Sequence, residues 1–319
     1  MPALNATALA SELGQATLEQ LWRQWRPVGA TTSSPIPCRT IVDPETLILM
    51  SLTMLEHERR LADVVWSWIG VNHALVSVQR LGNLRGQFPE VAAHRLAFIA
   101  ASRVDTDKDP RWKSLQMAAA ERLDYRTSKR RAIEPQFSSW ATLLLQLRQG
   151  MGVGAKADVL SFVLGLNSNT AEWASVSMIA ESIGYTTTAV RRVAEDLAAA
   201  RFIRALEVPD GDGAARMFSA HPTQWAGLLG VSYSQPGWGY WRERFQFVIE
   251  VLAWLKAEQT RPTSPYAQDV AARAILTRHG AALRRDRIVE PIEFAGAALG
   301  RDYLEAAVRA LIAWWANHG

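Results

Sequence analysis

The sequence has few of the residues on which metal and redox sites depend. Only one of its 319 residues is a cysteine, Cys38, which excludes an internal disulfide and any multi-cysteine zinc site within one chain. The six histidines are scattered, and none lies in a metal-ligand spacing such as H-E-x-x-H. We therefore expect no metal and no other cofactor, and the low cysteine content indicates a reducing compartment.

Long hydrophobic runs and targeting signals are also missing. No run approaches the roughly 18 uninterrupted apolar residues that a membrane span requires. The first residues, Met1 to Leu4, lack the basic start and long apolar core of a secretory signal. The sequence therefore predicts a cytoplasmic protein with no membrane partner.

Catalytic signatures are equally scarce. No Gly-x-Ser-x-Gly nucleophile elbow occurs, and Cys38 lies in a proline-rich connector that suits a nucleophile poorly. The stretch from Gly150 to Ala155 matches the G-x-G-x-x-G/A dinucleotide fingerprint, which requires a preceding β-strand. Residues 143–148 are instead rich in leucine, glutamine and arginine, which favour a helix. We expect no catalytic residues and no enzyme activity; a nucleotide-binding enzyme is an alternative only if a strand precedes Gly150.

The residues that are abundant indicate a globular, mostly helical protein. Hydrophobic residues make up 49% of the chain and charged residues 21%, which is usual for soluble domains. Alanine, leucine and arginine dominate and strand-forming residues are sparse, which favours helices. The chain is too long for one ordinary core, so we expect about two or three domains. The net charge of +4 and the pI of about 9.4 are compatible with a polyanionic partner without requiring one.

Helical spacing and proline-rich breaks divide the chain into segments. Asp43, followed by Pro44, is expected to cap the first helix of a compact unit, and Ser77 to cap a later helix. A helix closed by Gly70 precedes the helix that Ser77 caps, which is the pattern either of a diverged helix-turn-helix over 61–88 or of an ordinary helical hairpin. The predicted segments are 1–40, an N-terminal helix and proline-rich connector; 41–102, a helical unit; 103–149, a basic linker and helix; 150–230, a domain described next; and 231–319, a C-terminal helical domain.

The most informative stretch runs from Ala157 to Ala220. Its hydrophobic spacing predicts these elements: helices over 157–164, 176–184 and 188–197, then strands over 202–206 and 215–220. Gly184 is expected to end the second helix in a left-handed conformation, and Thr186 or Thr187 to cap the third. An Asp-Gly turn typical of a hairpin lies between the two strands.

This order of elements, three helices followed by a short β-hairpin, resembles a winged helix-turn-helix DNA-binding domain. The resemblance is to the broad class of bacterial winged-helix transcription regulators, such as the MarR-like and ArsR-like groups, and rests on no signature peculiar to one family. It implies a mainly α fold in which the third helix lies in the major groove of duplex DNA and the hairpin forms the wing. Metal sensing of the ArsR-like kind is not implied, because this domain contains only His221 and no cysteine.

The resemblance also implies a set of DNA contacts. Arginine can bind guanine or phosphate, and threonine can meet a base edge or a phosphate. The candidate DNA-binding residues are Ser177, Tyr185, Thr187, Thr188, Arg191, Arg192, Arg204 and Arg216. We expect a transcriptional regulator that binds duplex DNA, with flanking helices that serve dimerisation or sensing.

A protein-interaction role is the alternative. The predicted wing carries Asp210 and Asp212, which phosphate would repel, and winged helices also serve protein contacts. In that case the chain is a scaffold or a regulatory subunit, and its partner is another protein or a second copy. The basic runs Lys129–Arg131 and 278–287 are either further phosphate contacts or solvated surface.

Overall fold

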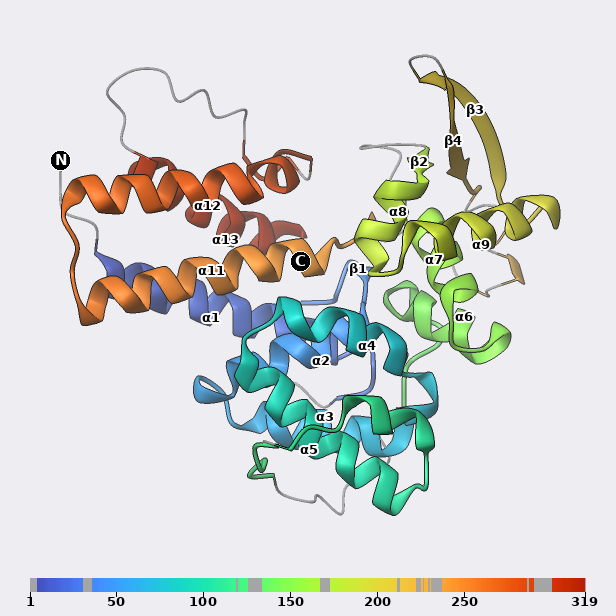
Figure 1. Ribbon diagram of the computed structural model, residues 1–319, viewed down its shortest axis with the longest axis horizontal. Helices are drawn as coiled ribbons and strands as arrows, with labels where there is room; N and C mark the ends of the chain where they lie inside the picture. The colour runs from blue at the N-terminus through green and yellow to red at the C-terminus, as the bar shows by residue number, and fades with distance from the viewer. Residues whose placement is uncertain are drawn as a thin grey trace. The chain divides into compact units, whose positions relative to one another are not determined.

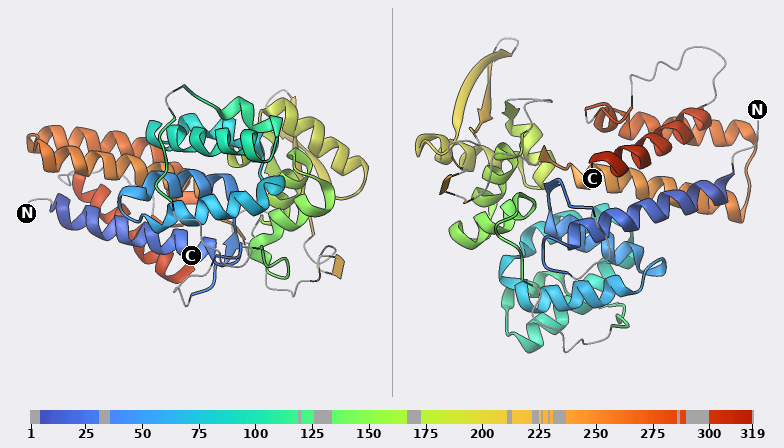
Figure 2. Two further views of the ribbon diagram at one scale, coloured as in Figure 1. Left: turned by 90° about the horizontal axis from the view of Figure 1, so that it is seen from below. Right: turned by 180° about the vertical axis from the view of Figure 1, so that it is seen from behind.

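The computed structural model is mainly helical, with two small sheets among the residues that it describes (Figures 1 and 2). The described residues are 5–30, 36–118, 120–125, 134–166, 173–210, 213–221, 225, 227–228, 230, 237–285, 287–289 and 300–318. They belong to two compact units: unit 1, Met1–Trp22 with Trp241–Gly319, and unit 2, Arg23–Tyr240. Unit 1 therefore combines the two ends of the chain. None of the described helices is long and hydrophobic enough to cross a membrane.

Unit 1 is built from long helices. They are α1 (Ala6–Trp25, which passes into unit 2 after Trp22), α11 (Trp241–Thr260), α12 (Pro265–Arg285) and α13 (Gly300–His318). The side-chain amide of Gln20 on α1 donates to the carbonyl of Trp315 on α13, and Arg309 of α13 pairs with Glu12 of α1. The first and last helices of the chain are therefore joined directly.

The first half of unit 2 is a bundle of helices whose starts follow from local capping. Its elements are β1 (Thr40–Ile41), α2 (Pro44–Thr53), α3 (Arg60–Asn72), α4 (Val78–Leu84) and α5 (Glu90–Thr106), with short 3₁₀ helices η1 (Met54–Glu56), η2 (His73–Leu75), η3 (Arg85–Gln87) and η4 (Pro110–Leu115). The Asp43 side chain accepts from the backbone of Thr46 at the start of α2, and Ser77 accepts from the backbone of Arg80 at the start of α4. Both predicted caps are confirmed.

Gly70 does not end a helix, contrary to prediction. Helix α3 continues through Gly70 to Asn72, whose side-chain amide donates to the carbonyl of Trp68. The 3₁₀ helix η2 follows α3 directly, and its tighter turn takes the place of a glycine cap. In α4 the side chain of Arg80 is fully buried, which makes α4 unlike a helix that presents arginine to DNA.

The second half of unit 2 contains the predicted helices and hairpin. Its elements are η5 (Trp140–Thr142), α6 (Leu143–Met151), α7 (Ala155–Leu164), β2 (Ala174–Ser175), α8 (Val176–Ile183), α9 (Thr187–Ala199), β3 (Arg204–Asp210), β4 (Gly213–Ser219) and β5 (Gly237–Trp238). The strands β2, β4 and β3 form an antiparallel sheet in that order, and β5 pairs in parallel with β1. Gly184 follows α8 with a φ of 73°, as predicted. The core between helices and sheet includes the buried residues Phe162, Ile179, Ile183, Val190, Leu197 and Phe218.

The hairpin is longer than the predicted one. Strand pairing continues from Arg204, opposite Ser219, as far as Asp210, opposite Gly213, so most of the predicted wing loop is strand. Pro209 is tolerated because β3 is an edge strand of this sheet.

The dinucleotide alternative does not agree with the structure. Helix α6, not a strand, precedes the glycine-rich segment, and Gly150 lies inside that helix. Gly152 has a φ of 88° and forms the turn to α7. Without a strand the segment cannot present a phosphate site of the dinucleotide type.

Some predictions fall on residues outside the described ones. These are the basic run Lys129–Arg131, the wing residue Asp212 and the side chain of Asp210.

Candidate nucleic-acid interface and the buried network beneath it

The N-terminal half of α9 presents an exposed polar face. Thr187, Thr188, Arg191 and Arg192 are all exposed, and they are related by the three- and four-residue steps that bring helical residues to one side. The opposite side carries Val190, Ala194 and Leu197, which are buried in the core. The amphipathic pattern of the helix thus decides which of its residues face solvent.

The remaining predicted contacts are more dispersed. Ser177 is exposed near the start of α8 and its hydroxyl lies 2.9 Å from that of Ser175. Arg204 is exposed on β3, and its guanidinium donates to Ser219. Arg216 of β4 lies 3.6 Å from Glu195 of α9, with both side chains about half exposed. The two strand arginines therefore lie on the surface of the sheet, beside the C-terminal half of α9.

Tyr185 departs from the prediction. It is buried, only 8% exposed, and its hydroxyl donates to Asp158 at 3.1 Å. The hydroxyl also lies 3.3 Å from that of Ser77. Tyr185 lies immediately before α9 in the chain, but it points into the protein, so the structure places it apart from the exposed face.

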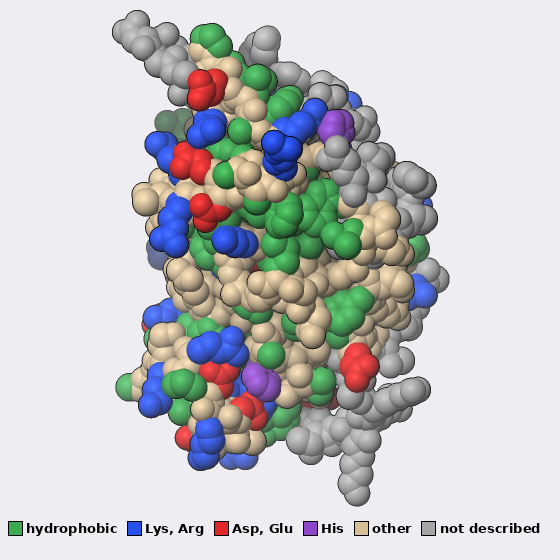
Figure 3. Space-filling view, turned by 90° about the vertical axis from the view of Figure 1, so that its right-hand side faces the viewer, with side chains coloured by type: hydrophobic (Ala, Val, Ile, Leu, Met, Phe, Trp, Pro, Cys, Tyr) green, Lys and Arg blue, Asp and Glu red, His purple; other side chains and the backbone are tan. Residues whose placement is uncertain are grey.

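The surface around the sheet carries charges of both signs. Figure 3 faces this side of unit 2 and shows Lys and Arg side chains interspersed with Asp and Glu near the top of the view. Lys156 lies 3.9 Å from Asp196 on α9. Glu207 on β3 is the residue directly opposite Arg216 on β4 in the strand register. Arg191 and Arg192, by contrast, form no ion pair with any described residue.

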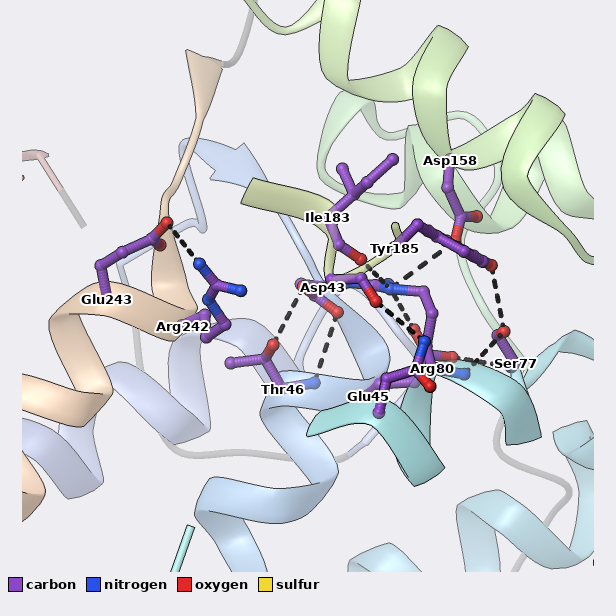
Figure 4. A network of polar contacts seen from close by, with 12 residues as sticks. Asp43, Glu45, Thr46, Ser77, Arg80, Asp158, Ile183, Tyr185, Arg242 and Glu243 are labelled. Atoms are coloured by element: carbon purple, nitrogen blue, oxygen red, sulfur yellow. Dashed lines mark hydrogen bonds and ion pairs between the residues drawn. The ribbon is translucent and has the colours of Figure 1, made fainter. Parts of the chain in front are cut away.

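Next to the turn between α8 and α9 lies a buried network of charged groups (Figure 4). Arg80 of α4 is its first centre. The guanidinium donates to Asp43 at 2.7 Å, to Glu45 at 2.6 Å and, through Nε, to the carbonyl of Ile183 at 2.6 Å. Because Ile183 is the last residue of α8, this arginine joins the α2–α5 bundle to the turn between α8 and α9.

Arg148 of α6 is the second centre. Its guanidinium donates to both oxygens of Glu45, at 2.7 and 2.9 Å, and to both oxygens of Asp158, at 2.8 and 2.9 Å. A further bond of 2.9 Å reaches the carbonyl of Leu75. Arg148 and both carboxylates are fully buried. Such forked pairs are among the strongest charge-assisted hydrogen bonds in proteins.

Two more contacts hold the turn before α9. The amide of Asn83 on α4 donates to the carbonyl of Gly184 at 3.1 Å. The side chain of Leu84 lies so close to Gly184 that an added Cβ would come within 2.8 Å of it. Together with Tyr185 and Ile183, these contacts fix the position of the turn from which α9 starts.

The electrostatics of the network follow from its position at helix ends. The carboxylates Asp43, Glu45 and Asp158 outnumber the guanidinium groups of Arg80 and Arg148. Asp43 is the N-cap of α2, Glu45 is in the first turn of α2, and Asp158 is in the first turn of α7. The partial positive charge of a helix N-terminus stabilises a carboxylate, which compensates the excess.

The pKa values reflect the same balance. Burial alone would raise the pKa of Asp43. The positive charge of Arg80 and the hydrogen bonds from Arg80 and Thr46 outweigh this effect, so the pKa of Asp43 lies below its ordinary value. Burial and the negative charge of Asp158 raise the pKa of the Tyr185 hydroxyl. Tyr185 therefore stays protonated and remains a hydrogen-bond donor to Asp158.

Sequence reasoning singled out three residues of this network, Asp43 and Ser77 as helix caps and Tyr185 as a DNA contact, and it did not relate them to one another. Among the described residues, no group of three or more His, Cys, Asp or Glu side chains is arranged to hold a metal ion.

Comparisons with models of known protein families, with curated proteins and with solved structures return no match for this chain.

Proposed function

We propose that this protein binds duplex DNA through a winged helix formed by α7, α8, α9 and the β3–β4 hairpin. One observation carries the proposal. The N-terminal half of α9 presents Arg191 and Arg192 with Thr187 and Thr188 on one exposed face, and neither arginine forms an ion pair with a described residue. Exposed arginine beside hydroxyl groups suits a surface that meets phosphates and base edges.

In this proposal α9 lies in the major groove. Arg191 and Arg192 bind guanine or phosphate, and Thr187 and Thr188 donate to the backbone or to base edges. The N-terminal end of α9 adds the partial positive charge of its free backbone N–H groups. Arg204 and Arg216 extend the contact from the hairpin. Binding energy comes mainly from neutralised phosphates, so affinity falls as salt rises.

The buried network supports this role through position. A helix that recognises bases must be held rigidly, because its side chains discriminate between bases only when they are well oriented. Arg80 and Tyr185 fix the turn from which α9 starts, and Asn83 fixes the carbonyl of Gly184. In this proposal Tyr185 acts by positioning α9 and does not itself touch DNA.

The experiment that tests the proposal is a gel shift or fluorescence-anisotropy titration with labelled genomic DNA fragments at several salt concentrations. The variant Arg191→Ala/Arg192→Ala is expected to lose binding at moderate salt. It should also lower the slope of log affinity against log salt by about two, one for each lost phosphate contact. Circular dichroism should show an unchanged fold, because both side chains are exposed.

A matched control is available at the start of α3. The variant Arg59→Ala/Arg60→Ala removes two adjacent exposed arginines from the same unit, and it should bind DNA as the wild type does. If the α9 variant binds DNA with unchanged affinity and salt slope, the proposal is wrong.

The exposed apolar residues of the hairpin favour a second candidate, contact with another protein. Leu206 is 44% exposed and Val208 is 37% exposed on the edge strand β3. An exposed apolar edge strand is suited to pairing with a second chain.

This candidate has its own test. If the hairpin joins two copies of the chain, analytical ultracentrifugation should show concentration-dependent association that the variant Leu206→Ser/Val208→Ser abolishes. A wild-type protein that stays monomeric at every concentration, with the same sedimentation as the variant, would contradict self-association through the hairpin.

A further inference from the structure

The structure contains an open groove at the base of the hairpin, beside the C-terminal half of α9. It has a volume of about 750 Å³, and its lining includes Trp173, Glu195, Arg201, Arg204 and Arg216. Known small-molecule sites have volumes of about 300–1,000 Å³, so the groove is large enough for a small ligand. None of the residues proposed to contact DNA from the N-terminal half of α9 lines it.

The charge of the groove is strongly positive. Its three arginines face a single carboxylate, that of Glu195, which lies 3.6 Å from Arg216 and is about half exposed. Arg204 is held by a bond to Ser219 and keeps its remaining donors. The side chain of Arg201 forms no hydrogen bond or ion pair with a described residue. An anion entering the groove would meet guanidinium donors that nothing else fully satisfies.

Arg201 occupies a backbone position where glycine is usual. Its φ is 61°, in the left-handed region. The backbone N–H of Arg201 bonds to the carbonyl of Ala198, and that of Phe202 bonds to the carbonyl of Leu197, which together form a Schellman motif at the end of α9. Glycine fits this position without strain, whereas a residue with a Cβ does not. An arginine here is disfavoured by the backbone, which points to a use for its side chain.

The groove also offers an aromatic surface. The guanidinium carbon of Arg204 lies 5.1 Å from the centre of the Trp173 ring, within the range of a cation–π contact. A planar base can stack on such a pair of tryptophan and arginine, because both present flat surfaces. Phosphate-binding arginines beside a stacking surface together fit a nucleotide.

We propose that this groove binds a nucleotide, with the phosphate held by Arg201, Arg204 and Arg216 and the base stacked against Trp173. The nucleotide is either free in solution or part of a nucleic-acid strand, since the two share this chemistry. The site shares Arg204 and Arg216 with the proposed duplex contact, but neither Arg191 nor Arg192 lines it, so it does not depend on whether the N-terminal half of α9 binds DNA.

The decisive variant is Arg201→Gly. Because glycine suits the left-handed position, this variant should fold at least as well as the wild type and melt at the same or a higher temperature. Its affinity for ATP, measured by isothermal titration calorimetry at low salt, should fall by about tenfold or more, as expected when one charge-assisted hydrogen bond is lost. The Arg201→Gly variant is thus expected to keep its fold and to bind ATP more weakly.

Further probes separate the parts of the ligand. Pyrophosphate should bind and adenosine should not, because the arginines recognise phosphate. Trp173→Leu should weaken ATP but leave pyrophosphate unchanged. Single-stranded oligothymidylate is the nucleic-acid probe: if it binds and ATP does not, the nucleotide belongs to a strand. In either case Arg201→Gly must weaken binding for the inference to stand.

The control is Arg191→Ala/Arg192→Ala, which should bind ATP and oligothymidylate as the wild type does even if its binding to duplex DNA is lost. The inference is overturned if ATP, pyrophosphate and oligothymidylate all fail to bind the wild type. It is equally overturned if Arg201→Gly binds them with unchanged affinity. Neither result bears on duplex binding through α9, which the α9 variant tests alone.

Discussion

Arg148 and Asp158 face each other across the turn between α6 and α7, with two parallel bonds of 2.8 and 2.9 Å between guanidinium and carboxylate. The same guanidinium also binds Glu45 of α2, and the same carboxylate accepts from Tyr185. The pair therefore lies at the centre of a chain of contacts that leads from the start of α2 to the start of α9.

Replacing Arg148 with methionine should destabilise the protein strongly. It removes the bonds that Glu45 and Asp158 accept from Arg148 while both carboxylates stay buried, and breaking a buried ion pair in this way costs about 3–5 kcal/mol. Urea unfolding followed by circular dichroism should show a lower midpoint. Arg148→Met/Asp158→Leu should be less destabilised than Arg148→Met alone, because the buried carboxylate that has lost its two bonds to Arg148 is then removed as well.

The exposed pair of Arg60 with Glu58 provides the control for this prediction. The Arg60 side chain is 71% exposed, so Arg60→Met should change the urea midpoint little. Equal effects of Arg148→Met and Arg60→Met would show that burial of the network does not matter for stability.

Replacing Asp43 with asparagine should produce a pH-dependent loss. The pKa of Asp43 is lowered in the folded state, so its contribution is present above the unfolded value, about 4, and disappears as the pH falls through the folded value. At neutral pH we expect Asp43→Asn to lower the free energy of unfolding by about 1–3 kcal/mol, because Arg80 loses a charged partner.

Asparagine can still cap α2, so the loss reports the ion pair and not the helix cap. Urea unfolding at a series of pH values should show the wild-type and variant curves converging in acid. A difference that stays constant from neutral to acid pH would contradict the lowered pKa of Asp43.

Tyr185 should give the opposite pH dependence. Its pKa is raised in the folded state, so below the unfolded value of about 10 the hydroxyl is protonated in both states and contributes fully. As the pH rises above that value the unfolded chain loses its proton first, and stability falls. Tyr185→Phe should be less stable than the wild type by about 1 kcal/mol at neutral pH, since the bond to Asp158 is lost.

Because phenylalanine cannot titrate, the stability of Tyr185→Phe should fall less steeply in alkali. The two proteins should therefore approach each other above about pH 10, which urea midpoints measured across that range would show. Parallel curves would mean that the Tyr185 hydroxyl has an ordinary pKa.

The sequence predicts those features that depend on neighbouring residues. The caps Asp43, Ser77 and Thr186 and the left-handed Gly184 all lie within a few residues of the groups they serve, and the structure confirms each of them. The three helices before the hairpin are predicted for the same reason, since their apolar spacing is local.

The buried network cannot be predicted in this way, because its members are distant in sequence. Arg148 and Glu45 are 103 residues apart, and nothing local relates them. A partial signal exists in the helical spacing: Arg80 lies four residues before the buried Leu84, and Arg148 four residues after the buried Leu144. A charged residue on an apolar face indicates a buried partner but does not identify it.

The hairpin and Tyr185 show two other limits. Pairing of β3 with β4 extends over residues that resemble a loop, because β3 is an edge strand and an edge strand tolerates Pro209. Tyr185 follows a glycine in a polar turn, where exposure is the usual expectation, yet Asp158 and Ser77 hold its hydroxyl inside. Tertiary contacts decided both cases.

Gly184 should not tolerate alanine. Its φ of 73° disfavours any residue with a Cβ by about 1–2 kcal/mol, and the added methyl group would lie 2.8 Å from a Leu84 methyl. Gly86 is a matched control, because no atom lies within 4 Å of the position that a Cβ would take there, and Gly86→Ala should unfold like the wild type. Similar melting temperatures for both variants would contradict a close contact between α4 and the α8–α9 turn.

Thr186 allows the stability of α9 to be separated from its proposed contact with DNA. Its hydroxyl caps the helix by accepting from the backbone of Ala189 at 3.3 Å, and its side chain is exposed. Thr186→Ala removes the cap and should lower the free energy of unfolding by about 1 kcal/mol. Thr186→Asp keeps a capping oxygen and adds a negative charge that favours the helix N-terminus, so it should be at least as stable as the wild type. If phosphate approaches this end of α9, the aspartate should nevertheless weaken DNA binding more than the alanine does. Thermal melting and anisotropy titrations on the two variants would show stability and binding moving in opposite directions. DNA affinity that simply follows stability would mean that phosphate does not lie near the start of α9.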